Sequence, residues 1–223
     1  MKEVILDTET TGLFVKDGHR IVEIGCIEIE DLIPTKNRFH CYLNPERKVS
    51  EKALEVHGYT DEFLSTQKKF AEVVDDFLNF IENKRLVIHN SEFDLSHLNN
   101  ELALLGKQKL NSQNAIDTLA LARDKFPGSP ISLDALCKRY RIDNSKRTQH
   151  TALIDCDLLA KVYINLLDQK EPTLNFKSED NIKTILSSSN TNQYHKKIIK
   201  PTEEESRLHK EYLKNNLKKN FFN

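Results

Sequence analysis

The sequence lacks the long apolar runs and leader segments that mark membrane and secreted proteins. No stretch approaches the ~20 apolar residues that a helix needs to cross a bilayer, so a membrane-spanning helix is excluded. The first three residues lead straight into a short apolar run at 4–6, without the longer apolar region and small-residue cleavage site of a signal peptide. We therefore expect a cytoplasmic protein with no membrane partner.

Cysteine is also scarce, and no two of the four cysteines form a CxxC pair. This spacing suggests neither a zinc site nor a disulfide framework. We expect buried free thiols, because an unpaired cysteine behaves as a small apolar side chain. The four residues are Cys26, Cys41, Cys137 and Cys156.

A strong net charge is absent as well, but the charge is unevenly distributed along the 223 residues. Residues 1–170 hold 23 Lys and Arg against 27 Asp and Glu, whereas residues 171–223 hold 10 against 7. An acidic body gains little from neutralising phosphates, the term that dominates non-specific affinity for nucleic acid. If the chain acts on nucleic acid, bound metals or a partner protein must help to hold it there.

The apolar residues follow two different periods in residues 1–170, and together they predict an α/β fold. Alternating or continuous apolar runs predict strands at 2–7, 20–30, 39–43, 86–88 and 115–116. Spacings of three and four predict helices at 50–56, 70–81, 94–105, 118–125, 132–140 and 151–167. Three strands in series followed by alternating strands and helices favour a mixed sheet with helices on its faces.

Beyond residue 170 the composition changes, and we expect three parts in the chain. The polar run at 187–193 has nothing to pack, so residues 171–199 are predicted to be a flexible linker after a domain at 1–170. Residues 200–223 begin with a capping-box signature at Thr202 and Glu205, and apolar residues follow at helical spacing: Leu208, Tyr212, Leu213 and Leu217. A helix this short usually needs a partner's groove.

The first motif that carries chemistry is the hexapeptide DTETTG at residues 7–12. Asp7 and Glu9 stand two positions apart at the end of an apolar strand, so their side chains project from the same face. Two carboxylates held together attract a cation, and hard oxygen ligands suit Mg²⁺ or Mn²⁺. The alternative is a strand end whose two acids simply face solvent.

Two further motifs supply carboxylates and a histidine. HNSEFD at 89–94 places Asp94 after a strand, where it is either a metal ligand or the N-cap of the next helix. In HTALID at 150–155, His150 and Asp155 are five residues apart, which on one helix would turn them about 140° away from each other. A shared site therefore requires His150 on the loop before the helix, where it is either a general base or an ordinary exposed residue.

In this order and at these separations, the three motifs resemble those of the DEDD superfamily of 3′ to 5′ exonucleases, in the DnaQ-like DEDDh branch whose last motif carries His. The segments 117–123, 126–128, 132–137 and 142–147 also resemble the proofreading epsilon-subunit family of bacterial DNA polymerase III, and the match runs from residue 1 to about 167. The resemblance implies an RNase H-like fold, a mixed five-stranded sheet flanked by helices, with a flexible C-terminal tail.

The resemblance also implies roles for individual residues. Two divalent ions, Mg²⁺ or Mn²⁺, would be held by Asp7, Glu9 and Asp155 for the tighter site and by Asp7 and Asp94 for the second. His150 would activate the attacking water. The residues implied to bind substrate are Asp7, Glu9, Thr10, Gly12, Lys52, His57, Phe93 and Asp155.

Several neighbouring residues have simpler interpretations. Lys52 can be a solvated lysine, Gly12 can serve only to make a turn, and Phe93 can belong to the core. Asp117 precedes a predicted helix and is interpreted as its cap. A basic stretch before His150 is expected to be solvated, with contact to a DNA backbone as the alternative: Arg139, Arg141, Lys146 and Arg147.

The expected function is that of a bacterial, cytoplasmic proofreading exonuclease subunit that removes mispaired 3′-terminal nucleotides during DNA replication. Its expected partners are a single-stranded or frayed 3′ end of DNA, the polymerase alpha subunit bound through residues 200–223, and a small third core subunit. One alternative is a related free-standing DNA or RNA exonuclease. Another is a non-catalytic replisome connector, which the loss of a carboxylate or of His150 would favour; all five residues are present.

Overall fold

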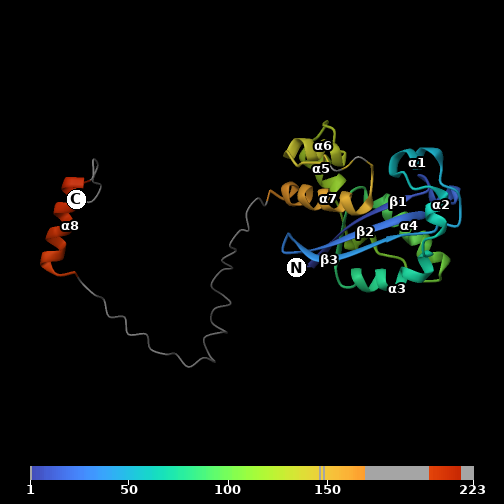
Figure 1. Ribbon diagram of the computed structural model, residues 1–223, viewed down its shortest axis with the longest axis horizontal. Coiled ribbons are helices and arrows are strands. Elements are labelled where there is room, and N and C mark those ends of the chain that lie inside the picture. Colours follow the sequence, from blue (N-terminus) through green and yellow to red (C-terminus); the bar gives the residue numbers. More distant parts are fainter. Residues whose placement is uncertain (1, 146, 148, 169–200, 217–223) are drawn as a thin grey trace, which may run out of the picture. The chain divides into compact units, whose positions relative to one another are not determined.

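The computed structural model describes residues 2–145, 147, 149–168 and 201–216, and the chain forms two compact units, Met1–Thr173 and Leu174–Asn223. The first unit contains the predicted domain (Figure 1). The predicted linker at 171–199 lies outside the described residues.

The first unit is built on a five-stranded mixed sheet with the order β3-β2-β1-β4-β5. The first three strands are antiparallel to one another in series, β4 pairs in parallel with β1, and β5 pairs in parallel with β4. The bounds are β1 Lys2–Thr10, β2 Ile21–Glu30, β3 Ile33–Tyr42, β4 Arg85–Ile88 and β5 Ala115–Asp117. The expected mixed five-stranded sheet is therefore confirmed.

Helices cover both faces of this sheet and make two separate cores (Figure 1). On one face α3 (Phe70–Ile81) and α4 (Ser91–Leu104) pack against side chains such as Val4 and Leu6. The other face, which includes Ile5, is covered by α5 (Thr118–Lys125), α6 (Leu133–Tyr140) and α7 (Ala152–Leu166). Because neighbouring strand residues point to opposite faces, β1 is apolar on both sides and reads as a continuous apolar run.

The elements differ from the sequence predictions in a few places. β3 begins six residues before the predicted start at 39, because it is a largely exposed edge strand without an apolar pattern. Helix α4 begins at Ser91, so Asp94 lies inside its first turn and does not start it. Short elements that were not predicted are α2 (Asp61–Ser65) and two 3₁₀ turns, η1 (Val15–Asp17) and η2 (Ser112–Asn114), while α1 (Glu51–His57) was predicted within one residue.

The start of α7 lies directly against the backbone of β2. A Cβ atom at Gly25 would come within 2.6 Å of the carbonyl carbon of Ala152 and 2.7 Å of the amide nitrogen of Leu153. In the same contact, the Cys156 thiol lies 3.2 Å from the carbonyl oxygen of Gly25. Glycine is therefore required at position 25, and this close approach brings the first turn of α7 to the carboxylates of β1.

The cysteines agree with the expectation of free thiols. All four are free, and Cys26, Cys137 and Cys156 are buried while Cys41 is partly exposed. None of the helices in the described residues is long and apolar enough to cross a membrane.

The second unit contains helix α8, Glu203–Asn216. The predicted capping box is present, because the Glu205 amide donates to Thr202 Oγ1 at 3.2 Å and the Thr202 amide donates to Glu205 Oε2 at 2.8 Å. Leu208 and Tyr212 are 56% and 62% exposed. Leu217, the last apolar residue of the predicted pattern, lies outside the described residues.

Candidate active site

Three segments bring four carboxylates to the end of β1. Asp7 and Glu9 come from the strand itself, Asp94 from the first turn of α4, and Asp155 from the first turn of α7. Burial raises the pKa of Asp7 well above its usual value, and the charges of Asp94, Glu9 and Asp155 raise it further. The sequence prediction that these four residues share one place is in agreement with this arrangement.

The same crowding acts on the other acids of the cluster. Burial, followed by the charges of Asp155 and other acids, raises the pKa of Glu9 to about 8. Burial raises the pKa of Asp94 to about 7, although hydrogen bonds from Thr8 oppose the shift. These raised pKa values mean that the surrounding protein supplies too little positive charge to neutralise the ionised carboxylates. A set of oxygen donors with surplus negative charge fits a hard divalent cation.

Asp94 does not cap its helix. Its Oδ1 accepts hydrogen bonds from the backbone amide of Thr8 at 3.0 Å and from the Thr8 hydroxyl at 2.7 Å. The N-cap of α4 is Asn90, in a left-handed conformation with φ of 73°. The N-cap alternative for Asp94 is therefore wrong, and Asp94 is instead tied to β1 between the two acids of the first motif. Asp117, by contrast, is a cap as expected, because it accepts the Leu119 amide at 2.9 Å.

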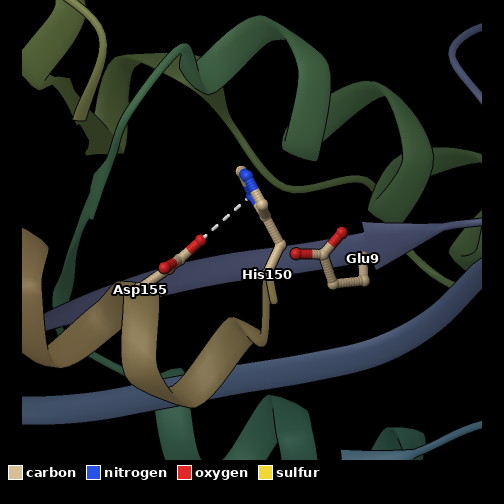
Figure 2. A group of neighbouring side chains, drawn as sticks. All are labelled: Glu9, His150 and Asp155. Atoms are coloured by element: carbon tan, nitrogen blue, oxygen red, sulfur yellow. Dashed lines mark ion pairs between the residues drawn. The ribbon is translucent and has the colours of Figure 1, made fainter. Parts of the chain in front are cut away.

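His150 lies on the loop before α7, facing the acids of β1 and α7. Potential ligand atoms of Glu9, His150 and Asp155 all lie within 4.8 Å of one another (Figure 2). His150 Nδ1 is 3.5 Å from Asp155 Oδ2, and the His150 side chain is 44% exposed while that of Asp155 is 5% exposed. The backbone amide of His150 donates to the carbonyl of Val56 at 3.1 Å, which fixes the loop against the end of α1.

Arg147 is the main residue of the site that sequence reasoning missed. Its guanidinium donates to both oxygens of Asp155, at 2.6 and 2.8 Å, and to Asp134 at 2.6 Å. Its Nη2 also lies 2.8 Å from His150 Nδ1. The side chain is only 8% exposed, so the interpretation of Arg147 as a solvated residue is wrong, whereas Arg139 and Arg141 are exposed as expected.

Arg147 also changes the acidity of its partner. Burial by itself would raise the pKa of Asp155, but the neighbouring His150 ring and the hydrogen bonds and charge of Arg147 outweigh this effect and lower it. Ionisation of Asp155 is therefore favoured, whereas ionisation of Asp7 and Glu9 is disfavoured. In this arrangement, a guanidinium neutralises the carboxylate that a metal ion would need.

A cavity of about 440 Å³ opens beside Glu9. The five remaining residues predicted to bind substrate all line it: Thr10, Gly12, Lys52, His57 and Phe93. Leu13 and Phe14, which were not predicted, add apolar side chains that are 66% and 55% exposed. Apolar side chains exposed at the rim of a cavity suit a ligand with a flat apolar face.

His57 is one of the residues that line this cavity. The ring is buried, its Nδ1 accepts the Tyr59 amide at 3.0 Å, and it stacks on the Tyr59 ring with centroids 4.8 Å apart. Because Nδ1 is an acceptor, the neutral ring carries its proton on Nε2. Nε2 has no hydrogen-bond partner among the residues that the structure describes.

Gly12 lies in a bend at residues 11–13 without a left-handed conformation, and a Cβ atom there would meet the ring of His19, so its small size also matters. Phe93 is half-buried beside His97 and is not a core residue. Lys52 is exposed at the edge of the cavity.

A mixed sheet of this order, with a cluster of acids and a loop histidine at the end of its central strand, defines the class of metal-dependent exonucleases. The family model RNase_T, described as an exonuclease, matches residues 4–163. The chain therefore belongs to the RNase_T exonuclease family.

Relatives match the chain along most of its length. DNA polymerase III subunit epsilon of Rickettsia conorii is 46% identical over 227 aligned residues, covering 98% of this chain and 97% of the relative. The subunit epsilon of Salmonella typhimurium is 48% identical over 171 residues, covering 73% and 70%. The expected resemblance to the epsilon-subunit family is confirmed.

Solved structures of exonucleases share the fold. Exonuclease X in complex with 5′ overhanging duplex DNA is 25% identical, with a TM-score of 0.59, covering 75% of this chain and 92% of that one. The nuclease domain of 3′hExo, described as a DEDDh family member bound to rAMP, has a TM-score of 0.63 at 17% identity, covering 77% and 94%. The expected RNase H-like exonuclease fold is confirmed.

The raised pKa of Glu9 predicts how stability depends on pH without metal. Since the folded-state pKa of about 8 exceeds the usual 4.5, protonated Glu9 favours folding below about pH 4.5, and this contribution is lost as the pH rises through 8. Melting temperatures measured in chelator should therefore fall between pH 5 and pH 8.5. The melting temperature of Glu9→Gln should fall less over the same pH range. Identical pH profiles of this variant and the unchanged protein would contradict a raised pKa of Glu9.

The contacts of Arg147 predict how its replacement changes the stability of the protein. Arg147→Met leaves buried Asp155 unpaired and should lower the free energy of unfolding of the metal-free protein by about 3 kcal/mol. Mn²⁺ should raise the melting temperature of this variant more than that of the unchanged protein, because the ion replaces the lost positive charge. Calorimetry with and without Mn²⁺ measures both effects.

The matched control for this prediction is Arg38→Met. Arg38 also makes two hydrogen bonds to an acid of α7, Asp157, but both side chains are more than 40% exposed. Its loss should cost about 0–1 kcal/mol and should not depend on Mn²⁺. Equal responses of the two variants to Mn²⁺ would exclude competition between Arg147 and the metal.

Proposed function

We propose that the chain is the proofreading 3′ to 5′ exonuclease subunit of a bacterial replicative DNA polymerase III. It removes mispaired 3′-terminal nucleotides from DNA by hydrolysing the last phosphodiester bond and releasing 5′-monophosphates. The observation that carries the proposal is the meeting of four carboxylates and His150 beside a cavity large enough for a small ligand. Similarity to epsilon subunits over nearly the whole chain supports it.

Two divalent cations, Mg²⁺ or Mn²⁺, are proposed as the cofactors. Asp7, Glu9 and Asp155 would hold one of them, and Asp7 and Asp94 the other. Cations held there would supply positive charge to the attacking and leaving oxygens of a phosphoryl displacement. The surplus negative charge of the cluster is what makes these residues suitable ligands.

His150 is proposed as the general base. A neutral imidazole accepts a proton only at the nitrogen that carries none, and Arg147 donates to Nδ1, which leaves the ring proton on Nε2. When Arg147 moves away, exchange with solvent can move the ring proton from Nε2 to Nδ1, where it can donate to Asp155 Oδ2, which lies 3.5 Å from Nδ1, and Nε2 is then free to take a proton from water. The proposal therefore requires Arg147 to leave His150 before catalysis.

The cavity is proposed to hold the 3′-terminal nucleotide. Leu13, Phe14 and Phe93 offer apolar surface to a base, and stacking of this kind is indifferent to sequence because every base has a flat π-face. His57 Nε2 and Lys52 supply donors for the sugar or phosphate, while Thr10 and Gly12 shape the floor. Because residues 1–170 are acidic overall, the metals and a partner must provide the remaining affinity.

An assay on DNA tests this function. Purified protein with Mg²⁺ or Mn²⁺ should release 5′-mononucleotides from a primer-template, faster from a mispaired 3′ end than from a paired one. His150→Ala should lower kcat by ~10²–10⁴-fold, the usual contribution of a general base, and Asp7→Asn should abolish release.

Two outcomes would favour other functions. Trimming of RNA but not of DNA would favour a related RNA exonuclease, and no hydrolysis of either despite bound metal would favour a replisome connector. Melting curves of the variants in chelator serve as the folding control.

We further propose that residues 200–223 bind the polymerase alpha subunit and that residues 171–199 tether this segment to the exonuclease domain at 1–170. The exposed side chains of Leu208 and Tyr212, one helical turn apart on α8, supply an apolar surface for a groove. Tethering raises the effective concentration of the nuclease at the primer end without new catalytic contacts. A small third core subunit is proposed as a further partner.

The tail proposal predicts a separation of binding from catalysis. Leu208→Ser with Tyr212→Ser should abolish co-purification with the alpha subunit, while kcat of the isolated protein on single-stranded DNA stays unchanged. Lys210→Ser, on the opposite side of the same helix, is the matched control and should retain binding. Loss of binding in the control, or none in the double variant, would contradict an apolar contact through this face.

A further inference from the structure

Glu23 is a buried acid that the proposed chemistry does not use. Its side chain is fully buried on β2, and in the β1–β2 register it stands directly opposite Glu9. A buried carboxylate is costly, and two like charges directly opposite each other in a sheet are destabilising. An apolar residue would stabilise this position better, so a role beyond packing is indicated.

Three separate elements donate to this carboxylate. Its Oε2 accepts the Tyr59 hydroxyl at 2.8 Å and the backbone amide of Ala152 at 2.9 Å, and its Oε1 lies 2.7 Å from His40 Nε2. Tyr59 follows α1, His40 belongs to β3, and Ala152 is the first residue of α7. Glu23 therefore connects the two sides of the active site from the same face of the sheet as Glu9.

The contact with Ala152 replaces an ordinary helix cap. The N-cap residue of α7, Thr151, makes no side-chain cap hydrogen bond within the described part of the chain. The first amides of a helix need acceptors, and a negative charge near them is favourable. Glu23 provides an acceptor from a neighbouring strand, and so it fixes where α7 begins.

His150 stands two residues before this anchor. The other side of its loop is fastened by the hydrogen bond from the His150 amide to the Val56 carbonyl. The Gln149 side chain of this loop lies over Gly58, the C-cap of α1, which has a φ of 76°. The loop is thus held between α1 and the Glu23 carboxylate.

We infer that Glu23 is a positioning residue that fixes the His150 loop, and through Tyr59 the ring of His57, by accepting the amide of Ala152. The inference rests on the proposed general-base role of His150. The inferred role depends on the hydrogen bonds that Glu23 accepts and not on its charge. Substitutions to Gln and to Ala should therefore have different effects. Gln at this position keeps one oxygen for Tyr59 and Ala152 and can donate its amide to His40, whereas Ala removes all three contacts.

The kinetic test is a double-mutant cycle on DNA hydrolysis. Glu23→Ala should lower kcat about 10- to 100-fold, as is usual when a residue that orients an active-site group is removed. Glu23→Gln should restore kcat to within about threefold of the unchanged protein, and Glu23→Ala should cost little further in a His150→Ala background. Equal losses in both backgrounds, or a Gln variant as impaired as the Ala variant, would overturn the inference.

A second measurement does not depend on activity. Hydrogen exchange of the Ala152 amide, followed by NMR, should be faster in Glu23→Ala and close to normal in Glu23→Gln. An unchanged exchange rate of the Ala152 amide in Glu23→Ala would overturn the inference that Glu23 fixes the His150 loop. If the unchanged protein hydrolyses no nucleic acid, the proposed function fails, while this exchange experiment still decides whether Glu23 holds the loop.

Glu28 provides the matched control. It is a buried glutamate on the same strand, 2% exposed, and it is held by Lys84 at 2.8 Å and Asn37 at 2.8 Å, away from the active site. Glu28→Ala should lower the melting temperature but leave kcat and the exchange of the Ala152 amide unchanged. If Glu28→Ala impaired both as strongly as Glu23→Ala, general destabilisation would explain the effect and the inference would be overturned.

Discussion

Repulsion between buried carboxylates is the constraint on which the rest of this structure depends. Asp7, Glu9 and Asp94 all have raised pKa values because burial and neighbouring charge disfavour their ionised forms. Side chains that repel one another stay together only if the backbone that carries them is rigid. The central strand β1 supplies this rigidity, since it is paired on both sides and lies between two apolar cores.

The positive charges around the cluster are few and specifically placed. Arg147 neutralises Asp155, the one acid of the cluster whose pKa is lowered, and leaves the acids of β1 without a full counter-charge. On the same face of the sheet, Glu23 is satisfied by donors from three segments and adds to the negative field around Glu9. Carboxylates without a full counter-charge lower the stability of the metal-free protein. The same charge attracts divalent cations, as the proposed function requires.

Catalysis and attachment are proposed to lie on different parts of the chain. The described residues of the first unit form the acids, the histidine loop and the cavity, while the second unit contributes a capped helix with exposed apolar side chains. An acidic nuclease body binds DNA weakly by itself, so a tether to a polymerase would compensate by raising its local concentration. Weak intrinsic binding would also spare a correctly paired primer end.

The sequence by itself determined the sheet, most helix positions and the carboxylate motifs, because apolar periodicity and short motifs are local properties of the chain. It also placed His150 on a loop, since five residues of helix would have turned it away from Asp155. Only the tertiary structure decided where the edge strand β3 begins, the contact of Asp94 with Thr8, and the roles of Arg147 and Glu23. These depend on contacts such as Glu23 with Ala152, which join residues 129 positions apart and leave no periodic signal in the sequence.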